Sequence, residues 1–260
     1  MRRNGTLAIY ANRCRGFVFQ LANRAKNLTQ SAEAKNVMLN ASLYQLQLRL
    51  AILDDFHGDK SAELDDIEKV LSSVEADPND LRSSLLARLR CANIKSQRYL
   101  MAKSNSSSEV SEYYRNAQKE LARIISGRED INDISAEDII KSLENQFADI
   151  MVDAAVEYLS NRLINAGQNV EEIKNTAKSI AEIMSAEIFD KLGKKEKLNF
   201  AMISLQCYAA IRNSNIENNI SPETDVKIDI AKTASILFGA EDIETMINND
   251  SNTICRMITE

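Results

Sequence analysis

The sequence predicts an all-α fold, and three observations lead to that prediction. The 260 residues contain only 7 glycines and 2 prolines, so few residues interrupt a regular helix. Apolar residues recur three and four positions apart through most of the chain, which is the spacing of one face of a helix. Several of these stretches begin or end with residues that are typical of helix caps. We therefore expect a bundle of about nine to ten helices, arranged as two packed helical subdomains.

Residues 1–105 are expected to form a basic N-terminal helical bundle. Its first helix is predicted by apolar residues in strict four–three spacing, here called the N-terminal seam: Leu7, Ala11, Cys14, Val18, Leu21, Ala25 and Leu28. The next helix is predicted by a stripe in the same rhythm: Ala34, Val37, Ala41, Tyr44, Leu48 and Ala51. Two further helices are expected after the turn at 57–59 and after Asp77-Pro78, where the aspartate is a typical cap and proline suits the first helical position.

Residues 109–260 are expected to form a larger acidic bundle around a central helix at 136–166. The serine-rich segment 104–108 is the best candidate for a linker between the two bundles. Ser135 and Asp138 have the spacing of an N-terminal capping box, and Gly167 suits a left-handed stop. We expect one uninterrupted helix between these signals, with three of its residues in the second core: Phe147, Met151 and Tyr158. Apolar stripes predict the remaining helices at 110–124, 173–188, 198–211 and 226–237.

Charge is distributed in blocks along the chain. Residues 1–50 hold eight Lys/Arg and one acid, residues 51–80 hold two and ten, and residues 81–105 hold six and none. A basic helical surface in the first third would bind phosphates or an acidic partner. The candidate residues for such a surface are Arg13, Arg15, Arg24, Arg90, Lys95 and Arg98. The alternative is that the acidic block docks on the two basic segments inside the protein.

Residue types and spacing offer little support for catalysis. The chain has a single histidine, His57, and its glycines are never closer than eleven positions, which rules out glycine-rich phosphate loops. The four cysteines stand far apart, so we expect reduced thiols rather than a metal site or disulfides. Asp149, Asp153 and Glu157 form an acidic stripe that is best explained as a solvated helix edge. We expect no cofactor and no metal.

The favoured function is a non-catalytic helical module that binds another protein and regulates or scaffolds it. A nucleic-acid-associated protein that uses its basic N-terminal helices is the alternative, and an all-helical enzyme of unfamiliar type is the second alternative. No uninterrupted apolar run approaches the ~18 residues of a membrane span, so we expect a soluble, cytoplasmic protein with no membrane contact.

Overall fold

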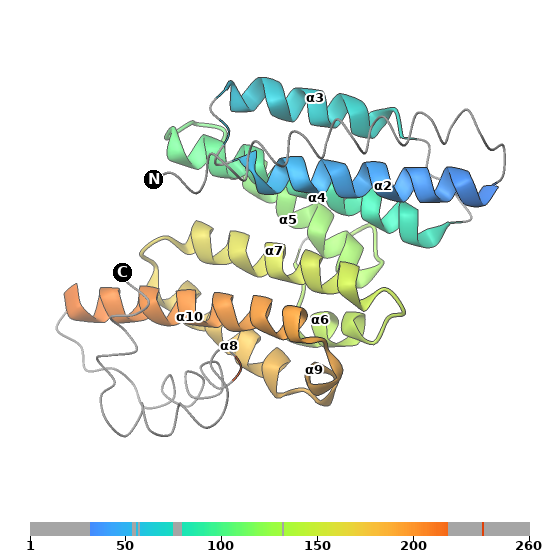
Figure 1. The fold of residues 1–260 in the computed structure, drawn as a ribbon. Helices are drawn as coiled ribbons and strands as arrows, with labels where there is room; N and C mark the ends of the chain where they lie inside the picture. Colours follow the sequence, from blue (N-terminus) through green and yellow to red (C-terminus); the bar gives the residue numbers. More distant parts are fainter. Residues whose placement is uncertain are drawn as a thin grey trace, which may run out of the picture. The chain divides into compact units, whose positions relative to one another are not determined.

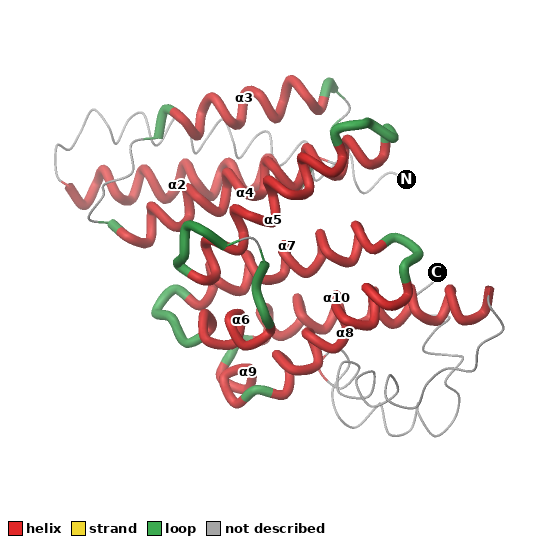
Figure 2. The backbone as a smooth tube through the Cα atoms, turned by 180° about the vertical axis from the view of Figure 1, so that it is seen from behind, coloured by secondary structure: helices red, strands yellow, loops and turns green. Residues whose placement is uncertain are grey.

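The computed structural model describes residues 32–53, 56, 58–74, 80–131, 133–217 and 236. The described residues form nine helices and include no strand, which confirms the all-α prediction (Figures 1 and 2). The helices are α2 (Ala32–Ala51), α3 (Lys60–Ser72), α4 (Leu81–Ser104), α5 (Val110–Ser126), α6 (Ala136–Leu143), α7 (Ala148–Ala166), α8 (Val170–Ser185), α9 (Glu187–Lys191) and α10 (Lys194–Glu217). The N-terminal seam and the helix expected at 226–237 lie outside the described residues, apart from residue 236.

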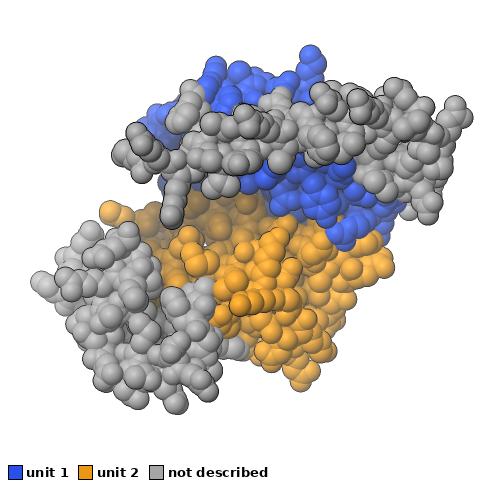
Figure 3. All heavy atoms as spheres, viewed as in Figure 1, with its two compact units in different colours: residues 1–124 blue, residues 125–260 orange. Residues whose placement is uncertain are grey.

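The chain divides into two compact units, residues 1–124 and residues 125–260, and the division falls within α5 (Figure 3). Each unit is described by itself. Among the described residues, no helix combines the length and the apolar character that crossing a membrane requires.

Helices α2, α3 and α4 of the first unit pack against one another around an apolar core. Helix α2 contributes Leu43, Leu46 and Leu50, each at most 5% exposed, and α3 contributes Leu64 and Ile67, which are fully buried. Helix α3 begins where predicted, because the Asp59 carboxylate accepts hydrogen bonds from the backbone N–H groups of Ser61 and Ala62 at 2.9 and 3.2 Å. Helix α5 contacts α4 through the Tyr99 and Tyr114 rings, whose centroids are 5.3 Å apart.

Helix α4 begins three residues later than Asp77-Pro78 predicts. Its first residue is Leu81, and the carboxylate of Asp80 accepts the backbone N–H of Ser83 at 3.1 Å. Both aspartates have the chemistry of an N-cap, so sequence alone does not choose between them.

Helices α6 to α10 of the second unit surround a more apolar core. Helix α10 packs on α7 and α8, while α6 packs on the same two helices and the short α9 lies against α6 and α8. Phe189 and Phe200 meet edge to face with their centroids 5.9 Å apart. Cys207 is fully buried, as its helical core position predicts, and burial raises the pKa of its thiol to about 12.

The prediction of a single helix at 136–166 is wrong, because two helices, α6 and α7, occupy this range. The capping box at Ser135 and Asp138 and the positive φ of Gly167 (58°) are present as expected. Between them, the Asn145 side chain accepts the backbone N–H of Phe147 at 3.0 Å, a local bond that competes with the helical ladder. Helix α7 then begins at Ala148 with Phe147 as its N-cap.

The break also changes which predicted core residues are buried. Met151 and Tyr158 are 3% and 1% exposed, which confirms their place in the core of the second unit. Phe147 is only half-buried, because it lies at the break rather than in the middle of a helix.

Candidate functional site

Three of the six basic candidates lie in the described part of the chain, all of them on α4. These are Arg90, Lys95 and Arg98, whereas Arg13, Arg15 and Arg24 lie outside the described residues. The three α4 residues differ in their surroundings.

Arg90 is buried, so it does not belong to the exposed basic surface for which it was a candidate. Its side chain is 1% exposed. Its Nε donates to the Leu43 carbonyl at 3.3 Å, and its Nη2 donates to the Gln47 side-chain oxygen at 2.6 Å, both on α2. Arg90 follows Leu86 and precedes Ile94 by four residues, so it lies on the buried face of α4. It therefore joins two helices instead of presenting charge to a ligand.

Arg98 holds two carboxylates of α3. Its Nη2 lies 2.8 Å from oxygens of both Asp65 and Glu68, which are three residues apart on one side of that helix. The hydrogen bond to Asp65 raises the pKa of Arg98, burial opposes this, and Glu68 adds to the increase.

A second arginine, Arg49 of α2, holds α3 in the same way. It lies 2.7 Å from Glu63 and 2.6 Å from Asp66, again two acids three residues apart. Burial alone would lower the pKa of Arg49, but the hydrogen bonds and charges of the two acids outweigh burial and raise it. The acidic residues of α3 thus pair with Arg49 of α2 and Arg98 of α4. This agrees with the alternative that the acidic segment 51–80 docks on the basic segments inside the protein. Arg49 is not among the basic candidates that the sequence indicates, although it pairs with an acidic helix of the same unit.

Lys95 takes part in a cluster around one carboxylate of α5. Its Nζ lies 3.1 Å from Glu120, and Arg88 and Arg123 approach the same carboxylate at 3.7 and 3.9 Å. The Glu120 side chain is 15% exposed, so this cluster joins α4 to α5 at the edge of the core.

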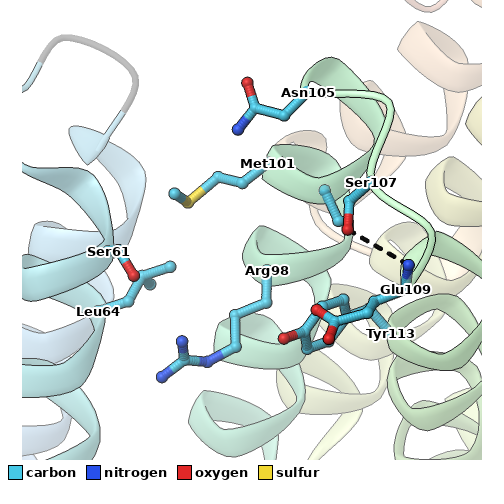
Figure 4. Close-up of a pocket in the computed structure, with 9 residues that line it drawn as sticks. Ser61, Leu64, Arg98, Met101, Asn105, Ser107, Glu109 and Tyr113 are labelled. Carbon is cyan, nitrogen blue, oxygen red and sulfur yellow. Dashed lines mark hydrogen bonds between the residues drawn. The ribbon is translucent and has the colours of Figure 1, made fainter.

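A cavity of about 180 Å³ opens beside Arg98 (Figure 4). Its lining residues are Ser61, Leu64, Arg98, Met101, Ala102, Asn105, Ser107, Glu109 and Tyr113. Ser61 and Leu64 come from α3 and face α4, while Ser107 accepts the backbone N–H of Glu109 at 3.2 Å. The volume is below the roughly 300–1,000 Å³ of pockets that hold drug-sized ligands.

The lining of this cavity mixes apolar and polar side chains. Arg98 is held by α3, and the charge of Glu109 together with a hydrogen bond to it raises the pKa of the Tyr113 phenol. A phenol with a raised pKa stays protonated near neutral pH, so it is a poor general base.

The other candidates for chemistry are not brought together. His57 lies outside the described residues, Asp149 is exposed, and Asp153 and Glu157 are half-buried. Within the described part of the chain, no group of three or more histidine, cysteine or acidic side chains is placed to hold a metal ion.

One face of α2 carries apolar residues that the structure leaves partly exposed. Four residues form this face, here called the α2 stripe: Ala41, which is half-buried, and Tyr44, Leu48 and Ala51, which are exposed. Tyr44 is 48% exposed and Leu48 is 44% exposed, although their spacing predicted the packed face of the helix. The packed face instead consists of Leu43, Leu46 and Leu50, so α2 is apolar on two sides.

Comparison with models of protein families, with curated proteins and with solved structures gives no match for this chain.

Proposed function

We propose that this chain is a non-catalytic helical module that binds another protein through the α2 stripe, and that it regulates or scaffolds that protein. One observation carries the proposal: Tyr44 and Leu48 are about half exposed, one turn apart, on a helix whose other apolar face is already buried. Single exposed apolar residues are ordinary on protein surfaces. A row of them at the spacing of a helix interface is typical of a docking face.

The partner that fits this face is an amphipathic helix. Apolar side chains at three- and four-residue spacing would lie between Tyr44 and Leu48 in the way that helices pack in a groove. Covering the exposed half of Leu48 would contribute on the order of 1 kcal/mol. Arg82 of α4 donates to the Tyr44 hydroxyl at 3.4 Å, which holds the polar end of that side chain toward its own unit.

The basic residues of α4 support this proposal over a phosphate-binding surface. Arg90 is buried against α2, and Arg98 is held by two acids of α3. We place the interaction in the cytoplasm, a proposal that the free thiols of Cys91 and Cys207 support.

The test compares what two matched variants capture from a native lysate. The full-length protein, Leu48→Asp and Met202→Asp are immobilised, and each is exposed to lysate at low and at high salt, with and without nuclease. Met202 of α10 is a fair control because it is also apolar, helical and about half exposed (49%).

We expect a set of proteins that the parent and Met202→Asp retain and that Leu48→Asp loses. Because the contact is apolar, high salt should leave it intact, whereas binding through phosphates falls steeply with salt. The same set on Leu48→Asp would contradict the proposal. Loss of capture after nuclease treatment would favour the nucleic-acid alternative instead.

A further inference from the structure

The α2 stripe has the same pattern in both directions along its helix. Its four residues are spaced by three, four and three positions, so the centre of the stripe lies at the level of position 46. The large side chains, Tyr44 and Leu48, lie on either side of this centre, and an alanine ends the stripe at positions 41 and 51. If a second α2 lies antiparallel about this centre, Tyr44 of each copy meets Leu48 of the other, and Ala41 meets Ala51. The stripe therefore complements itself, as a two-fold interface between identical chains requires.

The polar end of Tyr44 does not oppose this pairing. Its hydroxyl accepts a hydrogen bond from Arg82 of α4 at 3.4 Å, so it keeps a partner within its own unit. The apolar part of the ring, like the Leu48 side chain, is about half exposed and available for contact. Pairing Tyr44 with Leu48 thus covers apolar surface at the centre of the stripe without removing a hydrogen bond.

The residues that flank the stripe are uncharged. Gln45 lies on one side of the stripe and Gln47 on the other, and both are half-buried. Because the two-fold axis crosses both helices, each flanking residue lies beside its own copy, where a charged side chain would meet a like charge. An amide both donates and accepts, so it is compatible with its own copy. Helix α2 has no charged residue at 39–48, and Arg49 is buried and paired with acids of α3.

We infer that the α2 stripe binds the α2 stripe of a second copy of this chain, with the two helices antiparallel and position 46 at the two-fold axis. Four stripe residues and two flanking glutamines are far fewer than the roughly 20–30 residues per side of a standard interface, so the dimer is weak and reversible. The dimer itself does not depend on any other protein.

A regulatory consequence rests on the proposed function. The stripe of one chain is covered either by a second copy or by another protein, so the two complexes exclude one another. A higher concentration of this chain therefore leaves a smaller fraction of its stripes free for the other protein.

The first test measures the molar mass of the full-length protein by analytical ultracentrifugation between about 1 μM and about 1 mM, the range in which weak interfaces associate. The variants are Leu48→Asp and the matched control Met202→Asp, whose native side chain is similarly exposed (49% against 44%). Circular dichroism checks that both variants keep their helical content.

We expect the molar mass of the parent and of Met202→Asp to rise from 29.1 kDa toward twice that value with concentration. Leu48→Asp should need about ten-fold more protein to reach the same fraction of dimer, because a charge in an apolar contact is costly to desolvate. A parent that stays monomeric throughout would overturn the inference. Dimerisation of Leu48→Asp equal to that of the parent would overturn it as well.

The second test determines the register and remains readable if Leu48→Asp fails to fold. Ala41→Cys and Ala51→Cys are made in separate full-length chains, one of them isotope-labelled. Each is oxidised mildly alone and in an equal mixture, and the disulfides between chains are mapped by mass spectrometry. In the proposed register position 41 faces position 51 of the second copy. It lies ten residues from its own copy, about 15 Å along the helix, well beyond the roughly 3.5–4.5 Å between the Cβ atoms of a disulfide.

We expect the bond between positions 41 and 51 to form about ten-fold faster than a bond from either position to its own copy, because only the mixed pair lies within disulfide reach. Bonds from position 41 to position 41 that form as fast as the mixed bond would overturn the antiparallel register.

These tests separate the inference from the proposed function. A dimer with the bond between positions 41 and 51, but without stripe-dependent capture from a lysate, would leave self-association standing and remove the other protein. Stripe-dependent capture by a chain that stays monomeric would do the reverse.

Discussion

The two units bury their polar side chains in different ways. In the first unit, buried polar groups reach from one helix to another: Arg49 of α2 pairs with acids of α3, and Arg90 of α4 donates to Gln47 of α2. In the second unit, the buried hydroxyls of Ser142 and Thr176 donate to carbonyls of their own helices at 2.7 and 2.9 Å. Among the described residues, buried charged groups therefore join helices in the first unit, whereas these two buried hydroxyls of the second unit bond within their own helices.

This difference indicates what determines which helix faces pack together in the first unit. Helix α2 is apolar on two sides, so apolar pattern alone does not decide which side faces α4. The hydrogen bonds of Arg90 and the ion pairs of Arg49 fix that choice, because breaking them would leave buried charge without partners.

The largest effect should come from breaking the buried ion pair of the first unit. Arg49→Met keeps most of the side-chain volume but leaves the Glu63 carboxylate, 15% exposed, without its cation. We expect the free energy of unfolding, measured by urea denaturation, to fall by about 3 kcal/mol.

The matched change in the second unit is Lys141→Met. Lys141 lies 2.6 Å from Glu137, but their side chains are 69% and 74% exposed. Its removal should leave the free energy of unfolding nearly unchanged, because exposed ion pairs are screened by solvent. Losses of similar size for the two variants would remove the distinction between the units.

Smaller effects on the free energy of unfolding, of opposite sign in the two units, should come from replacing one buried tyrosine in each unit by phenylalanine. Tyr158 of α7 donates to Asp133 and accepts the backbone N–H of Ile134 at 3.3 Å, so Tyr158→Phe should lower the free energy of unfolding by about 1–2 kcal/mol. The hydroxyl of Tyr99 on α4 is buried and has no hydrogen-bond partner among the described residues. Tyr99→Phe should therefore raise the free energy of unfolding by up to about 1 kcal/mol.

Thermal or urea unfolding of the two phenylalanine variants checks this prediction. Burial raises the pKa of Tyr99 to about 12 and also raises that of Tyr158, so both phenols are neutral at pH 7 and ionisation does not complicate the comparison. A loss of stability in Tyr99→Phe equal to that in Tyr158→Phe would show that the Tyr99 hydroxyl has a partner.

The elements that sequence predicts well are those fixed by local chemistry. Ser135 caps α6 and Gly167 follows α7 with a positive φ, both as expected, and Asn169 caps α8. Each of these features depends on residues within one turn of the helix end, which the sequence displays directly.

The elements that sequence predicts poorly are those decided by competition or by distant partners. At Asn145 a local side-chain bond interrupts a helix whose apolar pattern continues without a break. Arg90 has polar character in sequence, yet acceptors on α2, more than forty residues away, allow its burial. Likewise, the spacing of Tyr44 and Leu48 reveals an apolar face but does not say which of the two apolar faces of α2 packs on α4.

The measurement that tests the central claim most directly is the capture of proteins by Leu48→Asp relative to Met202→Asp. If the α2 stripe is the docking face, the charge at Leu48 should remove proteins that the parent retains at high salt, because a charge in an apolar contact is costly to desolvate. Met202 is similarly exposed (49% against 44% for Leu48), so Met202→Asp makes the matched change on α10 and should retain these proteins. Equal capture by the two variants would contradict the account.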